Sequence, residues 1–189
     1  MGTDRKMTKS AGEHWVCTVL AGLGWAPALT RDGIVRTDLL AVNCETGAMI
    51  STQVKATRSA SPSFMFGARA TDPSRSSNEW YILVWFHGRP WQAPLSYVVP
   101  RDHVAAGVYI AYKDWLTDPS ASAGSRNTTL DVARIGAEVF EGYEGRWDLL
   151  DRAGSLAPVL LPQNYRELAV SDRVGLPDGH PWTMSLPEW

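Results

Sequence analysis

The sequence lacks a strong charge bias and a long apolar run. Its formal net charge is −2 over 189 residues, so no global attraction to nucleic acid is expected, and any such binding needs a local basic patch. No apolar run approaches the ~20 residues of a membrane span, and the polar start MGTDRKMTKS does not resemble a secretory signal. We therefore expect a cytoplasmic protein without a membrane partner.

Cysteine is scarce as well. The two cysteines, Cys17 and Cys44, both fall in apolar-patterned segments, which favours buried thiols in a reducing compartment. Hydrophobic residues make up 44% of the chain and charged residues 20%, as is typical of one globular domain. Four dispersed histidines show no metal-binding spacing and are expected on the surface or in packing: His14, His87, His103 and His180.

Periodicity predicts the order of helices and strands. The segment SAGEHWVCTVLAGLGW is predicted to be a helix, with Ser10 and Glu13 as a capping box and Gly24 as its stop. Strands are predicted at WAPAL, TDLLAVN, AMISTQVKAT, WYILVWF and LSYVVP, a helix toward the end of DHVAAGVYIAYKDWL, and a helix broken near Gly142 in LDVARIGAEVFEGYEGRWDLL. This order excludes an all-parallel doubly wound sheet, and it predicts an α/β fold with a central mixed sheet flanked by helices.

The last stretch of the chain differs in composition. After Leu150, prolines recur, as at Pro158 and Pro177. We expect one domain over residues 9–150. Residues 151–189 are then an extension that packs on the core or forms an oligomer contact, in the simplest case in a homodimer.

Three polar residues interrupt two strands that otherwise look built for burial. Gln53 and Lys55 share a face because strand side chains alternate. A turn centred on Glu45 and Thr46 places Asp38 opposite Gln53, and a turn shifted by one residue places it opposite Lys55. Both registers bring the three side chains to one face, which is either a solvated hairpin or a site. Leu40 and Val42 share that face and favour its being covered. A three-residue loop would instead place Asp38 on the other face.

Glu13 is the fourth candidate. The capping box fully explains a glutamate at this position, but Glu13 also lies beside the apolar stripe of its helix with Val16 and Leu20. A cap and a site role are compatible with each other.

These residues resemble a known constellation. A helix glutamate, a strand aspartate and a (D/E/Q)-x-K half-motif on the next strand resemble the PD-(D/E)XK nuclease superfamily, whose fold is restriction-endonuclease-like. The match would use Glu13, Asp38 and the QVK of Gln53, Val54 and Lys55, and it extends over roughly Ser10 to Leu150. Small bacterial and phage nuclease-like proteins share this pattern. Gln53 replaces the usual acid, as it does in some active members.

The resemblance implies a DNA nuclease that uses Mg²⁺ or Mn²⁺. Asp38 would be the main metal ligand, the Gln53 side chain and the Val54 carbonyl would add to it, and Glu13 would hold a metal-bound water or a second ion. Lys55 would orient or deprotonate the attacking water. Arg58, Arg69 and Arg75 would contact the DNA backbone or lie in a solvated loop.

Two alternatives remain open at this point. The same fold could bind nucleic acid or a protein partner without catalysis, because Gln53 removes one charge from the metal site. The chain could also be an unrelated α/β protein with a solvated hairpin face.

Overall fold

A central sheet with helices on its two faces organises the chain. The computed structural model describes residues 5–31, 34–89, 91–122 and 124–189. The helices and strands are α1 (Arg5–Gly22), β1 (Trp25–Leu29), β2 (Leu39–Asn43), β3 (Met49–Thr57), β4 (Ser63–Met65), η1 (Ala68–Thr71), β5 (Glu79–Trp85), β6 (Leu95–Pro100), α2 (Arg101–Leu116), β7 (Arg134–Gly136), η2 (Ala137–Tyr143), η3 (Trp147–Asp151), η4 (Gly154–Leu156), α3 (Asn164–Ala169) and η5 (Pro181–Thr183), where η marks a 3-10 helix.

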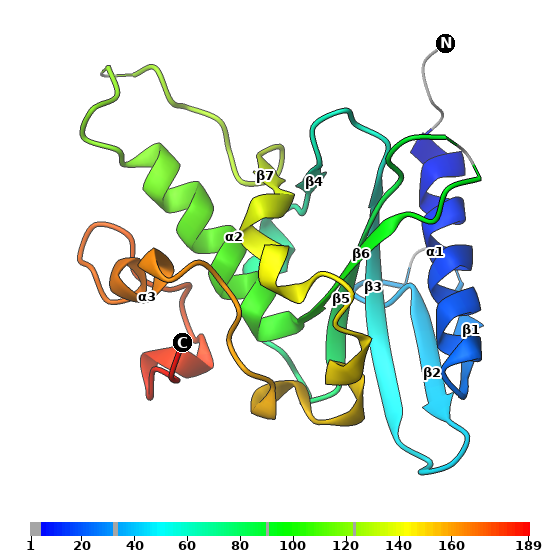
Figure 1. Cartoon of the computed structure of the whole chain (residues 1–189). Helices are drawn as coiled ribbons and strands as arrows, with labels where there is room; N and C mark the ends of the chain where they lie inside the picture. Colours follow the sequence, from blue (N-terminus) through cyan, green and yellow to red (C-terminus); the bar gives the residue numbers. More distant parts are fainter. Residues whose placement is uncertain (1–4, 32–33, 90, 123) are drawn as a thin grey trace.

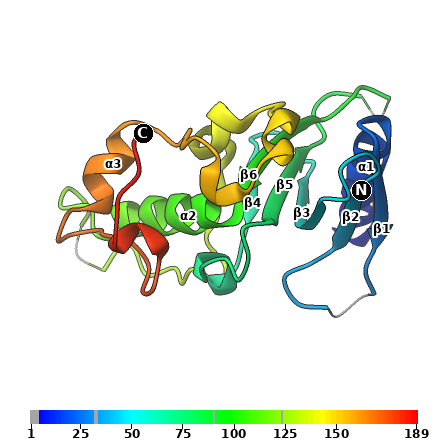
Figure 2. The same ribbon diagram turned by 90° about the horizontal axis from the view of Figure 1, so that it is seen from below.

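The five-stranded sheet is mixed, as predicted. Its order is β1-β2-β3-β5-β6, and β4 pairs separately with β7. Strands β1, β2 and β3 form an antiparallel meander, β3 pairs with β5 in parallel, and β6 runs antiparallel to β5. The predicted strands of this sheet are therefore confirmed. Figure 1 shows α1 and α2 on opposite sides of the sheet, and Figure 2 shows the same layers from below.

Helix α1 packs closely on β3. Its buried residues recur every fourth position, at Thr8, Gly12, Val16 and Leu20, which gives one narrow contact stripe. A Cβ added at Gly12 would lie 2.6 Å from the Ala56 Cβ, so this approach requires glycine.

The predicted capping box is wrong. The helix begins at Arg5, so Ser10 lies inside it and not at its N-cap. Glu13 instead forms an ion pair with Lys9, one turn earlier (3.2 Å).

The β2–β3 hairpin adopts the first of the two expected registers. Leu39 pairs with Thr52 and Val42 with Met49, which continues to Asp38 opposite Gln53. Leu40 and Val42 are 44% and 38% exposed, so the expectation that this part of the face is covered is wrong. Cys44, in the hairpin turn, is also exposed, unlike the predicted buried thiol.

The segment after α2 differs from its prediction. Helix α2 is helical from Arg101 onward, but the predicted helix over Leu130–Leu150 is instead β7 followed by 3-10 turns. A Cβ at Gly142 would lie 2.5 Å from the Leu160 carbonyl oxygen. The segment therefore packs against the chain around Leu160. A regular helix would turn some of its apolar residues toward solvent.

The last 39 residues share the core with the sheet. Val159, Leu161 and Val174 belong to the same buried cluster as Leu83 and Val98. His180 Nε2 lies 2.9 Å from the Asp102 carbonyl oxygen. The boundary at residue 150 stays a prediction. No helix in the described part of the chain has the length and apolar character that a membrane crossing requires.

Candidate functional site

Asp38 lies where β2 and β3 separate. Its backbone N–H donates to the Thr52 carbonyl oxygen (2.9 Å), and its carboxylate Oδ2 accepts the Val54 N–H (2.9 Å). The side chain thus replaces the strand carbonyl that would otherwise satisfy Val54. This hydrogen bond holds the carboxylate at the end of the β2–β3 ladder, where the side chain is 16% exposed.

Lys9 connects two of the predicted site residues. Its Nζ lies 3.2 Å from Glu13 Oε1 and 3.5 Å from Asp38 Oδ1. Burial lowers the pKa of Lys9, but the hydrogen bond and charge of Glu13 and the charge of Asp38 outweigh burial and raise the pKa overall. The structure therefore brings Glu13 and Asp38 together around a cation. Sequence reasoning missed Lys9, although its i, i+4 spacing to Glu13 was a signal.

Lys55 lies within electrostatic reach of Asp38. Burial lowers the pKa of its ammonium, the charge of Asp38 opposes that shift, and the charge of Lys9 adds to it. Desolvation therefore outweighs the nearby acid and makes the neutral amine more accessible than it is in water.

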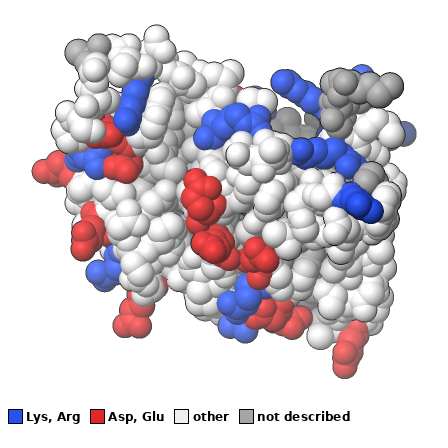
Figure 3. Space-filling model, turned by 45° about the horizontal axis from the view of Figure 1, so that its top comes forward, with Lys and Arg blue, Asp and Glu red and all other residues white. Residues whose placement is uncertain are grey.

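The hollow beside Lys55 is basic. It has a volume of about 400 Å³, and the charged residues that line it are Arg5, Lys55, Arg58 and Arg134, with no acid among the described residues of the lining. Figure 3, which brings this end of the sheet forward, shows Lys and Arg side chains gathered across it, with Asp and Glu lying mainly lower. A chain of net charge −2 therefore carries a local basic patch.

Gln53 opens onto a different hollow. Its neighbours there include Arg36, Arg69, Tyr81 and Arg101, whereas Asp38 and Glu13 line a third hollow with Lys9. Gln53 pairs with Tyr81 of β5 in the parallel ladder. The four predicted side chains thus surround one end of the sheet but open onto three neighbouring hollows.

The acids offer a limited metal site. Among the residues that the structure describes, no group of three His, Cys, Asp or Glu side chains is placed to hold a metal ion. Asp38 and Glu13 nevertheless converge on the Lys9 ammonium, so the space between them already accommodates one positive charge. Mg²⁺ is commonly bound by one or two carboxylates with water and substrate phosphates completing its shell. The donor set fits such a weakly held ion.

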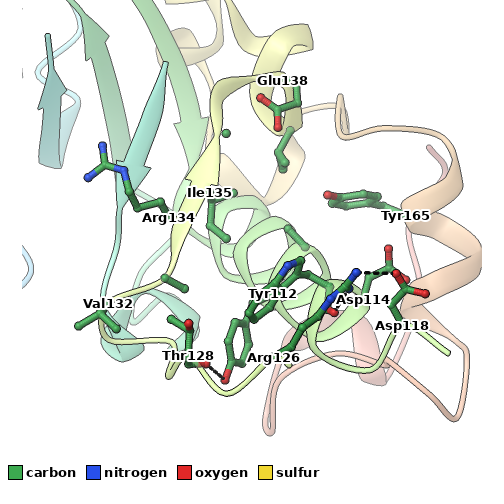
Figure 4. A pocket seen from close by; sticks show the side chains of 15 residues that line it. Tyr112, Asp114, Asp118, Arg126, Thr128, Val132, Arg134, Ile135, Glu138 and Tyr165 are labelled. Carbon is green, nitrogen blue, oxygen red and sulfur yellow. Dashed lines mark hydrogen bonds and ion pairs between the residues drawn. The ribbon is translucent and has the colours of Figure 1, made fainter. Parts of the chain in front are cut away.

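A further hollow lies away from these residues. It has a volume of about 530 Å³ between α2, β7 and α3. Figure 4 shows Tyr165 and Glu138 on one side, and Tyr112 and the Arg126–Asp118 ion pair on the other. None of the predicted site residues lines it.

Two histidines belong to a buried aromatic cluster. His103 Nδ1 lies 2.7 Å from the Tyr143 hydroxyl, and the Trp182 ring packs against both His103 and His180. Burial, together with the charge of His180, lowers the pKa of His103 to about 3. Their role is packing, one of the two roles that the sequence predicts.

Comparison with protein-family models, with curated proteins and with solved structures gave no match.

Proposed function

We propose that this protein is a metal-dependent nuclease that hydrolyses DNA phosphodiester bonds, with a restriction-endonuclease-like core of the PD-(D/E)XK type in its Q-x-K form. The observation that carries the proposal is the pairing of a fixed carboxylate with a basic hollow. Asp38 is held at the strand end by the Val54 N–H. Lys55, on which the charge of Asp38 acts, lines a hollow whose charged residues are all cations. Such a hollow suits a phosphate backbone.

The residues divide the chemistry between them. Asp38 and Glu13 would hold Mg²⁺ or Mn²⁺, which supplies charge stabilisation and a more acidic water. Lys55, whose pKa burial lowers, would accept a proton at Nζ from the attacking water as its oxygen bonds to phosphorus. The bond from phosphorus to the leaving sugar oxygen breaks, and that oxygen takes a proton from solvent. Arg5, Arg58 and Arg134 would hold the flanking phosphates.

A second candidate is a module that binds nucleic acid without cutting it. It is favoured by one observation: Lys9 already neutralises the acids that a metal would use. In that case the basic hollow would bind backbone phosphate, and Asp38 would serve the fold by satisfying Val54.

The test uses purified full-length protein on supercoiled plasmid and on branched DNA. Wild type should cut with Mg²⁺ or Mn²⁺ and not with EDTA. Asp38→Asn keeps an oxygen that can accept the Val54 N–H but loses the charge, so it should fold and bind DNA while losing cleavage. Cleavage by Asp38→Asn at the wild-type rate would refute the assignment. DNA binding without cleavage in any divalent metal would establish the non-catalytic module.

A further inference from the structure

The hollow beside Gln53 has buried positive charge. The Arg101 residue is 2% exposed and the Arg36 side chain 8%. Both approach one acid: Glu79 Oε2 lies 2.8 Å from Arg36 Nη2 and 3.3 Å from Arg101 Nε. Asp72 approaches Arg36 at 3.4 Å but is half exposed, so solvent screens it. One partly buried carboxylate, 15% exposed, therefore faces two more deeply buried guanidinium groups, and an unpaired buried charge is costly.

The same hollow has more hydrogen-bond donors than acceptors. The Arg36 Nε is buried without a described hydrogen-bond partner, and the Arg101 Nε lies 3.3 Å from Glu79 Oε2 without forming a hydrogen bond. Tyr81 Oη accepts from Arg101 Nη1 (3.4 Å), and no described group accepts the Tyr81 hydroxyl hydrogen. The Gln53 amide also has no described partner.

Two acceptors in the hollow each take one hydrogen bond from the protein. Asp131, the acid in its described lining, accepts the Ala68 N–H (3.1 Å). The Arg69 carbonyl oxygen accepts from Arg101 Nη2 (2.9 Å). A ligand that supplies acceptor oxygens and negative charge would satisfy this arrangement.

The backbone at Arg36 is strained. Its φ is 80°, a left-handed conformation that costs a non-glycine residue about 1 kcal/mol or more. The conformation aims the Arg36 guanidinium at Glu79 and at the Pro73 carbonyl oxygen (2.9 Å). The fold therefore maintains this guanidinium beside the hollow at a cost.

We propose that this hollow, of about 320 Å³, binds a phosphate group through Arg69, the Gln53 amide and the Tyr81 hydroxyl, with Arg36 and Arg101 supplying the positive potential behind them. The identity of that group as a DNA phosphate next to the one cut at Asp38 rests on the proposed function. The inference also explains why an amide stands where related nucleases carry an acid: a carboxylate at position 53 would repel the bound phosphate.

The experiment measures the melting temperature and the heat of binding of metal-free protein with inorganic phosphate, at constant ionic strength with chloride as the reference anion. Phosphate should stabilise wild type by mass action. Gln53→Glu should lose that stabilisation, and Arg69→Gln should weaken phosphate binding by at least about fivefold. Arg75→Gln is the matched control, because Arg75 is an exposed arginine of the same connection that does not line the hollow. Its phosphate response should equal that of wild type.

Wild type without a response to phosphate, or an equal response in all four proteins, would overturn the proposal. Asp38→Asn separates this result from the nuclease proposal, since it should still bind phosphate. A short DNA strand with and without a terminal phosphate tells the two phosphate sources apart. Preference for the strand phosphate over free phosphate supports the backbone as ligand, and equal affinity supports a free-phosphate site in the same hollow. If phosphate binds and no DNA is cut, the hollow stands and the nuclease proposal fails. If DNA is cut and phosphate has no effect, the reverse holds.

Discussion

Replacing Lys55 by methionine should stabilise the protein and slow cleavage. Burial lowers the pKa of Lys55 from its ordinary value of 10.5, so the folded protein disfavours the charged form. For a base whose pKa is lowered by folding, the loss of folding stability has its full value at every pH below the folded pKa. It fades as pH rises from the folded pKa toward 10.5, where the unfolded chain also loses its proton. Methionine removes the charge and keeps most of the apolar stem, so stability at pH 7 should rise.

The expected gain is about 1 kcal/mol, the lower end of what burying a polar group costs in proteins. For a chain of this size it raises the melting temperature by about 2–4 °C. The gain should shrink at pH 10. Loss of a proton-accepting group should slow cleavage by about 10²- to 10⁴-fold. Arg58→Met, in the same hollow but exposed, is the control: its melting temperature should not rise, because Arg58 lies over the Phe86 ring (4.4 Å from the centroid), and its DNA affinity should fall. A Lys55→Met protein that is less stable than wild type at pH 7, or that cuts normally, would refute the reasoning.

Three further outcomes follow from the site and the buried cluster. Glu13→Gln should slow cleavage by at least about tenfold, or ~1.4 kcal/mol. It should change the unfolding free energy by less than about 0.5 kcal/mol, because an ion pair at i,i+4 spacing contributes little to stability; unchanged cleavage would remove Glu13 from the site. Lys9→Met should tighten Mn²⁺ binding, measured by calorimetry, because the ammonium between the acids is gone; weaker binding would contradict a competing role. Because the folded pKa of His103 is about 3, the unfolding free energy should decrease as pH falls below about 6.5, by about 2 kcal/mol at pH 5. In His103→Gln the urea midpoint of unfolding should depend less on pH over that range.

The strands could be predicted from the sequence because the pattern of apolar residues within each strand is a local feature. WYILVWF is continuously apolar, and β5 has neighbours on both edges and both faces. The hairpin register was narrowed to two choices by the alternation of faces and by Gly47, whose φ is 73°. One of those choices is the observed one.

The helix start and the segment after α2 were not accessible in this way. Ser10 and Glu13 match a capping box, yet the polar residues before them continue the helix to Arg5, and nothing local distinguishes the two outcomes. In Leu130–Leu150 the apolar residues recur at nearly helical spacing, which predicts a helix. The backbone instead forms β7 and 3-10 turns there, because Gly142 packs closely against Leu160. Such contacts are tertiary, and they override local propensity.

Some residues of the candidate site could likewise be predicted from the sequence, and others could not. Asp38 and Lys55 could be found because each is polar within an apolar strand. The basic hollow could not, because Arg5 begins α1, Arg58 follows β3 and Arg134 begins β7. Arg134 reaches this hollow because β7 pairs with β4, which follows β3 along the chain. The net charge of −2 is a sum over the whole chain, in which acids elsewhere on the surface cancel the cations of the hollow. Since a phosphate backbone responds to the local potential and not to the total charge, the proposal of a DNA partner rests on the local basic hollow and not on the overall composition.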